Sequence, residues 1–445
     1  MPCIAIKASI TAAVKMTPQL EPSCFTTASL RAHPRGEFVM RVLATTLQAV
    51  DPGIAVRAFI ENNPLPKNKK LFVFGLGKAA ISMTHSLRDL VHITDTLVIT
   101  KYASPLDLEP ATVLLGDHPI PSDASFRAGM AAQKFLSQLT QDDLLVCLIS
   151  GGGSALMTTP IIPLEDLQQL TSALLACGAR IDEINALRRH LDLLKGGGVA
   201  QQANGAQIVS LLLSDVVGDS LETIASGPTA PDPSSREDAL AIIDKYDLRK
   251  MIPASIIPAL RETAKPSDAI FRSVENHLIG SNKLALQIAR SQIMTEGFTV
   301  KIITSKLEGE ARDVGREMAI QLKAELAKTP RPICLLAGGE TTVTINGSGK
   351  GGRNQELALS AVGELAELED VMLISLGTDG EDGPTDAAGA VVTGETAQRA
   401  KMLGLDEADF LLRNDAYSYF TQLDDLIKSG PSGTNVNDLV MCFAF

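Results

Sequence analysis

Short apolar segments alternate with longer amphipathic segments along most of this 445-residue chain. The amphipathic segments, such as residues 126–139 and 311–328, carry apolar residues at three- and four-residue spacing, which is typical of helices. The apolar segments have the length of buried strands and comprise residues 71–74, 97–100, 144–150, 208–213, 277–279, 299–303, 333–337 and 371–376. This alternation predicts an α/β fold with mostly parallel sheets and helices on both faces. Ligands bind such folds beyond the carboxyl ends of the strands.

The length of the chain favours two domains, because a single core of this size is uncommon. Its hydrophobic fraction of 45% and charged fraction of 21% are typical of a folded globular protein. A net charge of −12 and the absence of Trp argue against a nucleic-acid partner, which requires a basic face or stacking aromatics. Six cysteines without a CxxC pair indicate reduced thiols and a reducing compartment. The sequence leaves the oligomeric state open and allows a homo-oligomer.

The first 35 residues differ in composition from the rest of the chain. They contain one acidic residue and four basic residues, Lys7, Lys15, Arg31 and Arg35, with many Ser, Thr and Ala. This pattern is typical of a mitochondrial transit peptide, and a disordered extension explains it equally well. We therefore predict a cytoplasmic or mitochondrial protein. Its predicted parts are an N-terminal extension over residues 1–38, a first domain over 39–285 and a second domain over 286–445.

Residues 144–164 carry no charged side chain, which would suit a membrane span. However, they contain the sequence SGGGS at 150–154 and two prolines. A strand, a loop and the start of a helix explain them better, so no membrane segment is predicted.

The first predicted strand ends in a glycine-rich loop that contains Gly75, Gly77 and Lys78. The glycine spacing almost matches the dinucleotide-binding fingerprint, but that site would not need a lysine in the loop. The acidic residue expected about 20 residues later to hold the ribose is missing, because the next strand is followed by Lys101 and a tyrosine. The loop therefore leaves two hypotheses open, a nicotinamide-cofactor site and a phosphate site that uses Lys78.

A second glycine-rich loop follows the strand at 144–150 and comprises Ser150, Gly151, Gly152, Gly153 and Ser154. Free backbone NH groups at a helix N-terminus bind anions, so we expect this loop to hold a phosphate or a carboxylate. The alternative is a tight turn that needs glycine for close packing.

A helix over residues 184–195 would place Arg188 and Lys195 together on one face. Lys195 precedes Gly196 and Gly197 and would reach a phosphate there. Alternatively, it is a cation that complements the C-terminal end of the helix dipole, with the glycines as the cap.

Two aspartates, Asp215 and Asp219, follow the strand at 208–213. One or two carboxylates at such a strand end suit a hydrated Mg²⁺ that also binds substrate phosphate oxygens. The alternatives are that Asp215 is a base and that Asp219 caps the following turn. His118 is the one histidine in a polar loop, where a role in a turn explains it equally well.

In the C-terminal part, Glu340 follows one strand, and a glycine-rich loop at 347–352 leads into Arg353 and Asn354. Arg353 at a helix N-terminus would hold an oxyanion together with free NH groups. Asp379, Asp382 and Asp386 follow the strand at 371–376, and we expect at least one of them to bind a metal or substrate hydroxyls. Turn chemistry explains some of the Asp-Gly pairs. The polar segment SGTNVNDL before the final strand has no role that its chemistry alone identifies.

Ten segments resemble, in order, those of the class II glycerate kinase family: FGLGKAA, GDHPIPS, LISGGGSALM, LKGGG, SDVVGD, IASGPT, AGGETTV, GGRNQE, GTDGEDGPTDAAGA and SGTNVNDL. The similarity runs from about residue 39 to the end. It implies a Rossmann-like N-terminal domain and a MOFRL-type C-terminal domain, with the active site in the cleft between them. It also implies ATP-dependent phosphorylation of D-glycerate to 2-phosphoglycerate, with Lys78 and Arg353 as the essential residues.

The hypothesis that follows has Mg²⁺ bridging the ATP phosphates with Asp215 or Asp219, while Lys78 and Arg353 neutralise the transferred phosphoryl group. The other loop residues named above would grip phosphates or glycerate. Members of the family have also been labelled hydroxypyruvate reductases, so an NAD(P)H-dependent reductase remains an alternative. A non-catalytic sensor of a small acid or sugar phosphate is the third hypothesis.

Overall fold

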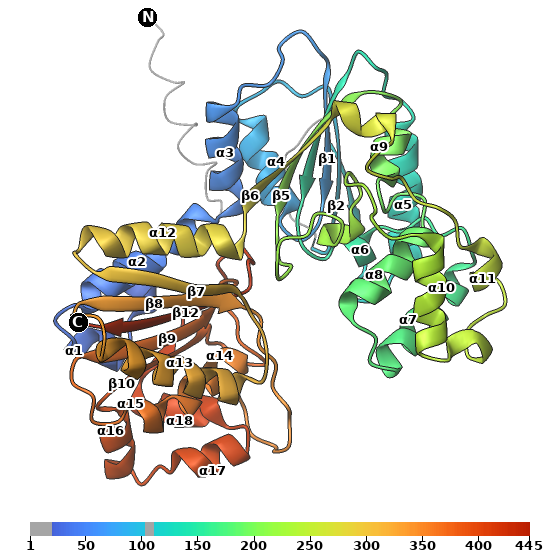
Figure 1. Ribbon diagram of the computed structural model, residues 1–445. Helices are drawn as coiled ribbons and strands as arrows, with labels where there is room; N and C mark the ends of the chain where they lie inside the picture. Colours follow the sequence, from blue (N-terminus) through green and yellow to red (C-terminus); the bar gives the residue numbers. More distant parts are fainter. Residues whose placement is uncertain (1–19, 103–110) are drawn as a thin grey trace, which may run out of the picture. The chain divides into compact units, whose positions relative to one another are not determined.

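The computed structural model describes residues 20–102 and 111–445. These residues form two compact α/β units, which Figure 1 shows with their elements labelled. One unit comprises residues 52–281, and the other joins residues 20–51 to residues 282–445. The predicted two-domain α/β class is confirmed. Each unit is described separately below.

The unit of residues 52–281 is built on a six-stranded parallel sheet with the order β3-β2-β1-β4-β5-β6. Its strands are β1 (Leu71–Leu76), β2 (Asp95–Thr100), β3 (Thr112–Leu115), β4 (Leu144–Ile149), β5 (Gln207–Leu213) and β6 (Val274–Gly280). Its helices are α3 (Pro52–Asn62), α4 (Ala80–Arg88), α5 (Asp123–Leu136), α6 (Gly153–Leu156), α7 (Leu164–Ala176), α8 (Ile181–His190), α9 (Gly198–Gln202), α10 (Arg236–Lys245) and α11 (Ile256–Ala259).

Side chains of the central strands alternate between the two faces of this sheet. Phe74 belongs to the core cluster that includes residues of α5 and α9, whereas Val73 belongs to the cluster that includes residues of α3 and α4. Because both faces are covered, β1 and β4 are apolar and buried along their whole length. The uncharged segment at 144–164 is therefore a core strand followed by loops and short helices. No helix within residues 20–102 and 111–445 is long and apolar enough to cross a membrane.

The other unit contains a mixed six-stranded sheet with the order β11-β10-β9-β12-β8-β7. Its strands are β7 (Thr299–Leu307), β8 (Ile333–Gly339), β9 (Val371–Gly377), β10 (Gly389–Thr393), β11 (Leu426–Ile427) and β12 (Asp438–Ala444). Its helices are α1 (Ala28–Ala32), α2 (Gly36–Ala49), α12 (Asn282–Thr295), α13 (Ala311–Leu326), α14 (Arg353–Ser360), α15 (Val362–Leu365), α16 (Thr396–Met402), α17 (Glu407–Leu412) and α18 (Ala416–Leu423).

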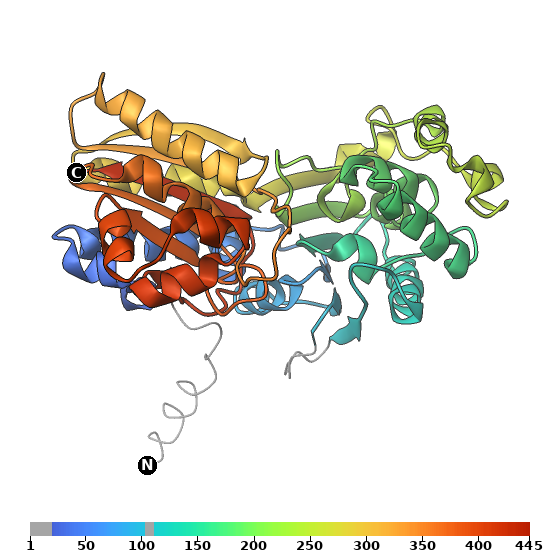
Figure 2. The same ribbon diagram turned by 90° about the horizontal axis from the view of Figure 1, so that it is seen from below.

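The prediction of mostly parallel sheets is wrong for this second sheet. Only β7 and β8 pair in parallel, while β12 runs antiparallel to both β8 and β9, and β10 runs antiparallel to β9. The final strand, β12, lies between β8 and β9. The local hydrophobic pattern of a strand does not determine which strands it pairs with, so the sequence could not predict this position. Within this unit, α2 and α12 pack together on one side of the sheet, as Figures 1 and 2 show.

Residues 20–51 belong to the same unit as the C-terminal half, which differs from the predicted domain boundaries. Ser29 donates its amide and its hydroxyl to the buried carboxylate of Asp425, each at 2.8 Å. Phe38 stacks on Phe298 with a centroid distance of 5.6 Å. The predicted extension over residues 1–38 therefore includes folded structure from residue 20 onward. Its first 19 residues, on which part of the transit-peptide prediction rests, lie outside the described residues.

We expect loss of residues 1–38 to prevent this unit from folding, because the deletion removes several buried apolar side chains. A sharper test is Leu30→Ala, since Leu30 is 1% exposed. The substitution should lower the free energy of unfolding by about 2–5 kcal/mol. Arg31→Ala on the same helix is the matched control, and it should change this free energy by less than about 1 kcal/mol because its ion pair with Asp424 is exposed. Thermal and urea unfolding measure both, and equal effects of the two variants would contradict a folded role for this segment.

Candidate active site

The glycine-rich loops after β1 and β4 pack directly against each other. Gly77 has a φ of +121°, and a Cβ atom there would lie 2.4 Å from the carbonyl oxygen of Ser150. The hydroxyl of Ser150 accepts a hydrogen bond from the amide of Ala79 at 3.0 Å, and the amide of Lys78 donates to the carbonyl of Gly151 at 3.0 Å. Only glycine tolerates this approach and backbone conformation at residue 77. The fingerprint-like loop therefore serves to place Lys78 beside the second loop.

Three basic or titratable side chains surround this second loop. A Cβ atom at Gly152 would lie 3.3 Å from Cε of Lys78 and 3.5 Å from Cδ2 of His118. Arg188 of α8 directs Nη1 toward the hydroxyl of Ser154 at 3.5 Å. Its Nε is buried without a hydrogen-bond partner among the described residues, and burial lowers the pKa of its guanidinium. This arrangement leaves positive charge that an anion would satisfy.

Backbone amides of the same loop are also available. The NH groups of Gly151 and Gly152 donate to no acceptor among residues 20–102 and 111–445. However, α6 is only four residues long, so the predicted contribution of a helix dipole is small. The hydroxyl groups of Ser154 and Ser226 form a hydrogen bond with an oxygen–oxygen distance of 2.7 Å. The structure thus supports an anion site made of amides, Lys78 and Arg188.

Asp215 lies against the same glycine loop. A Cβ atom at Gly151 would be 1.9 Å from its Oδ2, so a side chain at that position would displace the carboxylate. Burial raises the pKa of Asp215, while its own backbone amide and Lys78 oppose that rise. Asp219 follows at a positive φ of 58° and is partly buried. The described residues contain no group of three or more His, Cys, Asp or Glu side chains arranged to hold a metal ion.

Lys195 is buried and paired within the protein. Helix α8 ends at His190, so Lys195 does not share a helix face with Arg188 as predicted. Its ammonium donates to the carboxylate of Asp192 and to the carbonyl of Met157, each at 2.8 Å. These contacts attach the chain after α8 to the end of α6, and they do not support the prediction that Lys195 binds phosphate.

The glycines that follow Lys195 are also engaged in packing. The amides of Gly196 and Gly197 donate to the carbonyls of Ser226 and Gly227 at 3.0 and 2.8 Å. Both glycines have positive φ angles, which the close approach of the two segments requires. Their predicted phosphate contacts are therefore not supported by this geometry.

In the other unit, Arg353 is the first residue of α14 and is held by two carboxylates. Its Nε and Nη2 donate to Asp438 at 2.6 and 3.1 Å, and its Nη1 donates to Glu340 at 2.7 Å. Burial works to lower the pKa of Arg353, but Asp438 and Glu340 raise it above the ordinary arginine value. The guanidinium is thus charged and oriented before any substrate binds. Asp438, which the sequence left without a role, is the residue that orients it.

Two of the NH groups at the N-terminus of α14 that were predicted to be free are occupied. The amides of Asn354 and Gln355 donate to the carboxylate of Asp382 at 3.0 and 2.9 Å. A Cβ atom at Gly352 would lie 2.3 Å from Cγ of Asp382, which explains the glycine. Burial raises the pKa of Asp382 to about 7, although these amide bonds oppose that rise. Asp382 is therefore an internal cap for the helix that carries Arg353.

The neighbouring predicted residues have structural contacts as well. The side-chain oxygen of Asn354 accepts a hydrogen bond from the hydroxyl of Ser375 at 2.7 Å in the core. Asp379 accepts from the amide of Glu381 at 3.1 Å within a turn. Both contacts lie within the protein, and the predicted ligand contacts of Asn354 and Asp379 stay predictions.

The glycine-rich loop at 347–352 is attached to the turn between α17 and α18. The side-chain oxygen of Asn414 accepts from the amides of Asn346 and Gly347, each at 2.9 Å. Asp415 accepts from the amide of Lys350 at 3.1 Å. These bonds occupy the amides of Gly347 and Lys350 within the loop and attach the loop to the end of α17.

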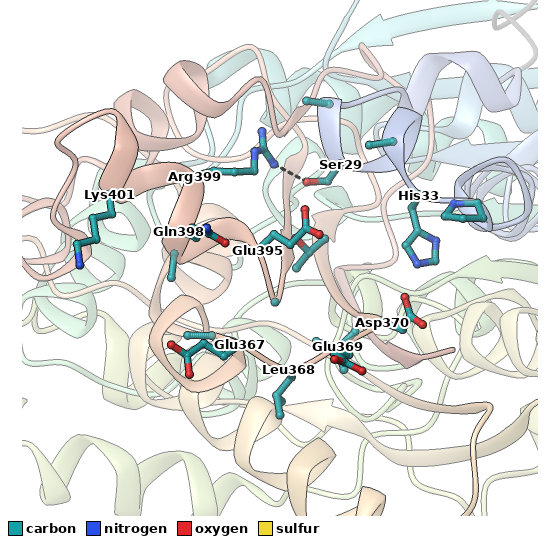
Figure 3. A pocket seen from close by; sticks show the side chains of 18 residues that line it. Ser29, His33, Glu367, Leu368, Glu369, Asp370, Glu395, Gln398, Arg399 and Lys401 are labelled. Carbon is teal, nitrogen blue, oxygen red and sulfur yellow. Dashed lines mark hydrogen bonds between the residues drawn. The ribbon is translucent and has the colours of Figure 1, made fainter.

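A separate cavity of about 830 Å³ lies in the unit that contains Arg353, as Figure 3 shows. It is lined by α1 with His33, by the segment 366–371 and by α16 with Arg399. Arg399 is already paired with Asp425 at 2.7 Å and with Ser29 at 2.8 Å. None of the predicted site residues lines this cavity, so it is distinct from the candidate site.

Sequence reasoning missed the contributions of Asp438, Asp192 and, in part, His118. Asp438 and His118 lie in polar segments that the sequence analysis noted without a firm role, whereas Asp192 lies between leucines and gave no signal. Arg353 is distant in sequence from its partner Asp438, and His118 meets a different loop, so spacing alone could not identify these contacts. Asp192 lies three residues from Lys195, but the pairing depends on the turn after α8.

Comparison with known proteins identifies the family to which the chain belongs. Residues 38–261 match a family described as a domain of unknown function, DUF4147, and residues 333–438 match the MOFRL family. The chain is 39% identical to D-glycerate 2-kinase of Thermotoga maritima, over 91% of this chain and 97% of the relative. It is 37% identical to glycerate kinase of Homo sapiens, over 89% and 88% of the two chains.

Solved structures show the same fold. The crystal structure of glycerate kinase from Thermotoga maritima superposes with a TM-score of 0.85 at 39% identity, covering 92% of this chain and 99% of that one. A Pyrococcus horikoshii protein superposes with a TM-score of 0.82 at 36% identity, covering 93% and 99%. With its paired DUF4147 and MOFRL regions and these full-length relatives, the chain belongs to the glycerate 2-kinase family of the MOFRL type.

Proposed function

We propose that this protein transfers the γ-phosphoryl group of ATP to D-glycerate and forms 2-phosphoglycerate and ADP. The observation that carries the proposal is the anion site of the 52–281 unit. There, Lys78 and the incompletely paired Arg188 lie beside the free amides of Gly151 and Gly152. The names of the relatives, D-glycerate 2-kinase and glycerate kinase, point to the reaction in which such a site would be used.

The proposed chemistry relies on positioning and charge neutralisation. Phosphoryl transfer passes through a loose transition state whose charge is spread over the equatorial oxygens, so correctly placed cations supply most of the rate enhancement. Lys78 and Arg188 would neutralise phosphate oxygens, with the amides of Gly151 and Gly152 as further donors. Arg353 is the second proposed catalytic cation, already charged and oriented by Asp438 and Glu340. Ser150 and Ser154 hold the loop in place.

Mg²⁺ is the metal that we propose for the reaction. The carboxylate of Asp215 lies beside the glycine loop, and Asp219 follows it in the same segment, so these two side chains would hold the ion. One or two carboxylates suffice, because Mg²⁺ retains waters and binds substrate phosphates. When bound, the ion would supply further neutralisation of phosphate charge.

The hypothesis of an NAD(P)H-dependent reductase has less support from the structure than the kinase hypothesis. It requires an acidic residue after β2 to hold a ribose, but β2 ends at Thr100 and is followed by Lys101. The glycines of the loop are explained by the packing of Gly77 against Ser150. The two sequence relatives described above carry kinase names.

The first experiment is phosphorus NMR of the purified protein with ATP, Mg²⁺ and D-glycerate, with NADH or NADPH absorbance followed in parallel with hydroxypyruvate. A new phosphomonoester signal together with ADP is the expected result, and its coupling to the carbon-bound protons identifies the phosphorylated hydroxyl. A reaction with EDTA should give no product. Cofactor oxidation without a phosphomonoester would replace the kinase by the reductase. No product in either assay, together with thermal stabilisation of the protein by D-glycerate, would favour the hypothesis of a non-catalytic sensor.

We further propose a cytoplasmic or mitochondrial location. A cleaved targeting peptide would have to end before residue 20, because Leu20 and the residues after it pack in the folded unit. Mass spectrometry of the N-terminus of the mature protein tests this limit. A mature chain that starts after Leu20 would contradict it.

A further inference from the structure

The loop that follows β3 places a histidine beside the proposed phosphate site. Gly116 packs so closely on α6 that a Cβ atom there would lie 2.0 Å from the carbonyl oxygen of Leu156. Its amide donates to the carbonyl of Thr100 at 3.0 Å. The hydroxyl of Ser125 then accepts from the amide of Asp117 at 3.0 Å. The backbone on the N-terminal side of His118 is thus attached to β2, α5 and α6.

The imidazole of His118 faces Gly152 together with Lys78. The two side chains approach the same point on the loop, at 3.5 and 3.3 Å from where a Cβ of residue 152 would be. The ring is partly buried and makes no hydrogen bond with any residue in the described part of the chain. A partly buried imidazole held over a phosphate loop with both ring nitrogens unpaired is available to a substrate.

The surroundings of His118 keep the ring neutral. Burial lowers its pKa, and the positive charges of Lys78, Lys101 and Arg188 lower it further. These cations come from the loop after β1, from the end of β2 and from α8. A neutral imidazole accepts a proton, whereas a protonated one would only add another cation. Bound phosphate would compensate the three cations, so the ring becomes a better base when substrate is present.

We propose that His118 is a further catalytic residue, which binds the attacking hydroxyl of glycerate and accepts its proton. The hydroxyl oxygen forms the new P–O bond, and the bond from the γ-phosphorus to the β–γ bridging oxygen breaks. ADP leaves with that oxygen and the bonding electron pair, and the hydroxyl proton moves to a ring nitrogen of His118. The proton passes to water when the products leave. This inference rests on the proposed kinase function.

The test compares the wild-type protein with His118→Gln, His118→Ala and the control His85→Gln. His85 is a partly buried histidine of α4 that has no place in the site. Single-turnover phosphorylation isolates the chemical step. We expect both His118 variants to slow this step by about 10²–10⁴-fold, which is the usual contribution of general base catalysis, with the KM for ATP changed by less than about threefold. The control should behave as wild type.

The pH profile separates a proton acceptor from a structural residue. The wild-type rate should fall toward acid with a limb that reports protonation of His118, and this limb should be absent from His118→Gln. A single-turnover rate within about threefold of wild type in folded His118→Gln, or an unchanged acid limb in that variant, would overturn the inference. If the wild-type protein itself formed no phosphoglycerate, the proposed function would fail instead, and the two failures are therefore distinguishable.

Discussion

Lys78→Ala should lower kcat for ATP-dependent glycerate phosphorylation by about 10³-fold while leaving the fold intact, because one cation on the transferred phosphoryl group is removed. The ammonium side chain is exposed and forms no ion pair among the described residues, so its loss does not leave a buried charge. We therefore expect the midpoint of thermal unfolding to change by less than about 2 °C. Steady-state kinetics and thermal unfolding on the same preparation measure both effects.

The matched control for Lys78 is Lys70→Ala. Lys70 is an exposed lysine that directly precedes β1, at the end opposite Lys78, and its backbone carbonyl accepts a hydrogen bond from the amide of Leu144 at 2.9 Å. Its replacement should leave kcat and KM unchanged. A kcat for Lys78→Ala close to that of Lys70→Ala would remove Lys78 from the catalytic residues.

Arg353→Ala should have two effects, one on catalysis and one on stability. Removal of the guanidinium should lower kcat by about 10²–10³-fold if it neutralises transition-state charge. It also leaves the carboxylate of Asp438, which is 3% exposed, without its partner. Breaking a buried ion pair on one side costs about 3–5 kcal/mol, so this variant should also unfold at a lower temperature.

The double variant Arg353→Ala with Asp438→Asn separates these effects. The neutral amide removes the unpaired buried charge, so thermal stability should return toward the wild-type value, whereas kcat should stay low. Asp438→Asn alone should lower kcat by about tenfold, because the guanidinium loses its bidentate partner and its orientation. Arg316→Ala, on the exposed side of α13, is the control for both measurements. Recovery of kcat along with stability in the double variant would show that Arg353 acts only on the fold.

Most predicted strands are present because their signal is local. A segment such as Leu71–Leu76 is apolar throughout, since both faces of its sheet are covered, and the glycines after it mark the end of the strand. The prediction omitted β3, which is short and partly exposed, the five-residue β10 and the two-residue β11. The parallel arrangement was inferred from strand and helix alternation, and it held for the whole first sheet but in the second sheet only for β7 and β8, which α13 connects.

Some residues of the candidate site were also recognisable from local sequence, and others were not. Lys78 and the glycines at 151 and 152 were recognisable, because a lysine and glycines at a strand end have few structural explanations. Lys195 was assigned to phosphate because it precedes three glycines, but its partner Asp192 lies on the turn after the helix ends. A buried cation and an exposed one look the same in a sequence.

The sequence by itself determined the strand positions, the glycine-rich loops and the family to which the chain belongs, because these depend on local apolar pattern, backbone freedom and ordered motifs. Only the tertiary structure decided that residues 20–51 pack with the C-terminal half, that Asp438 orients Arg353 and that Asp382 occupies the start of α14. Each of these contacts joins segments that are distant along the chain. A side chain acquires its partner, its burial and its pKa only when such segments meet, so these properties belong to the folded molecule.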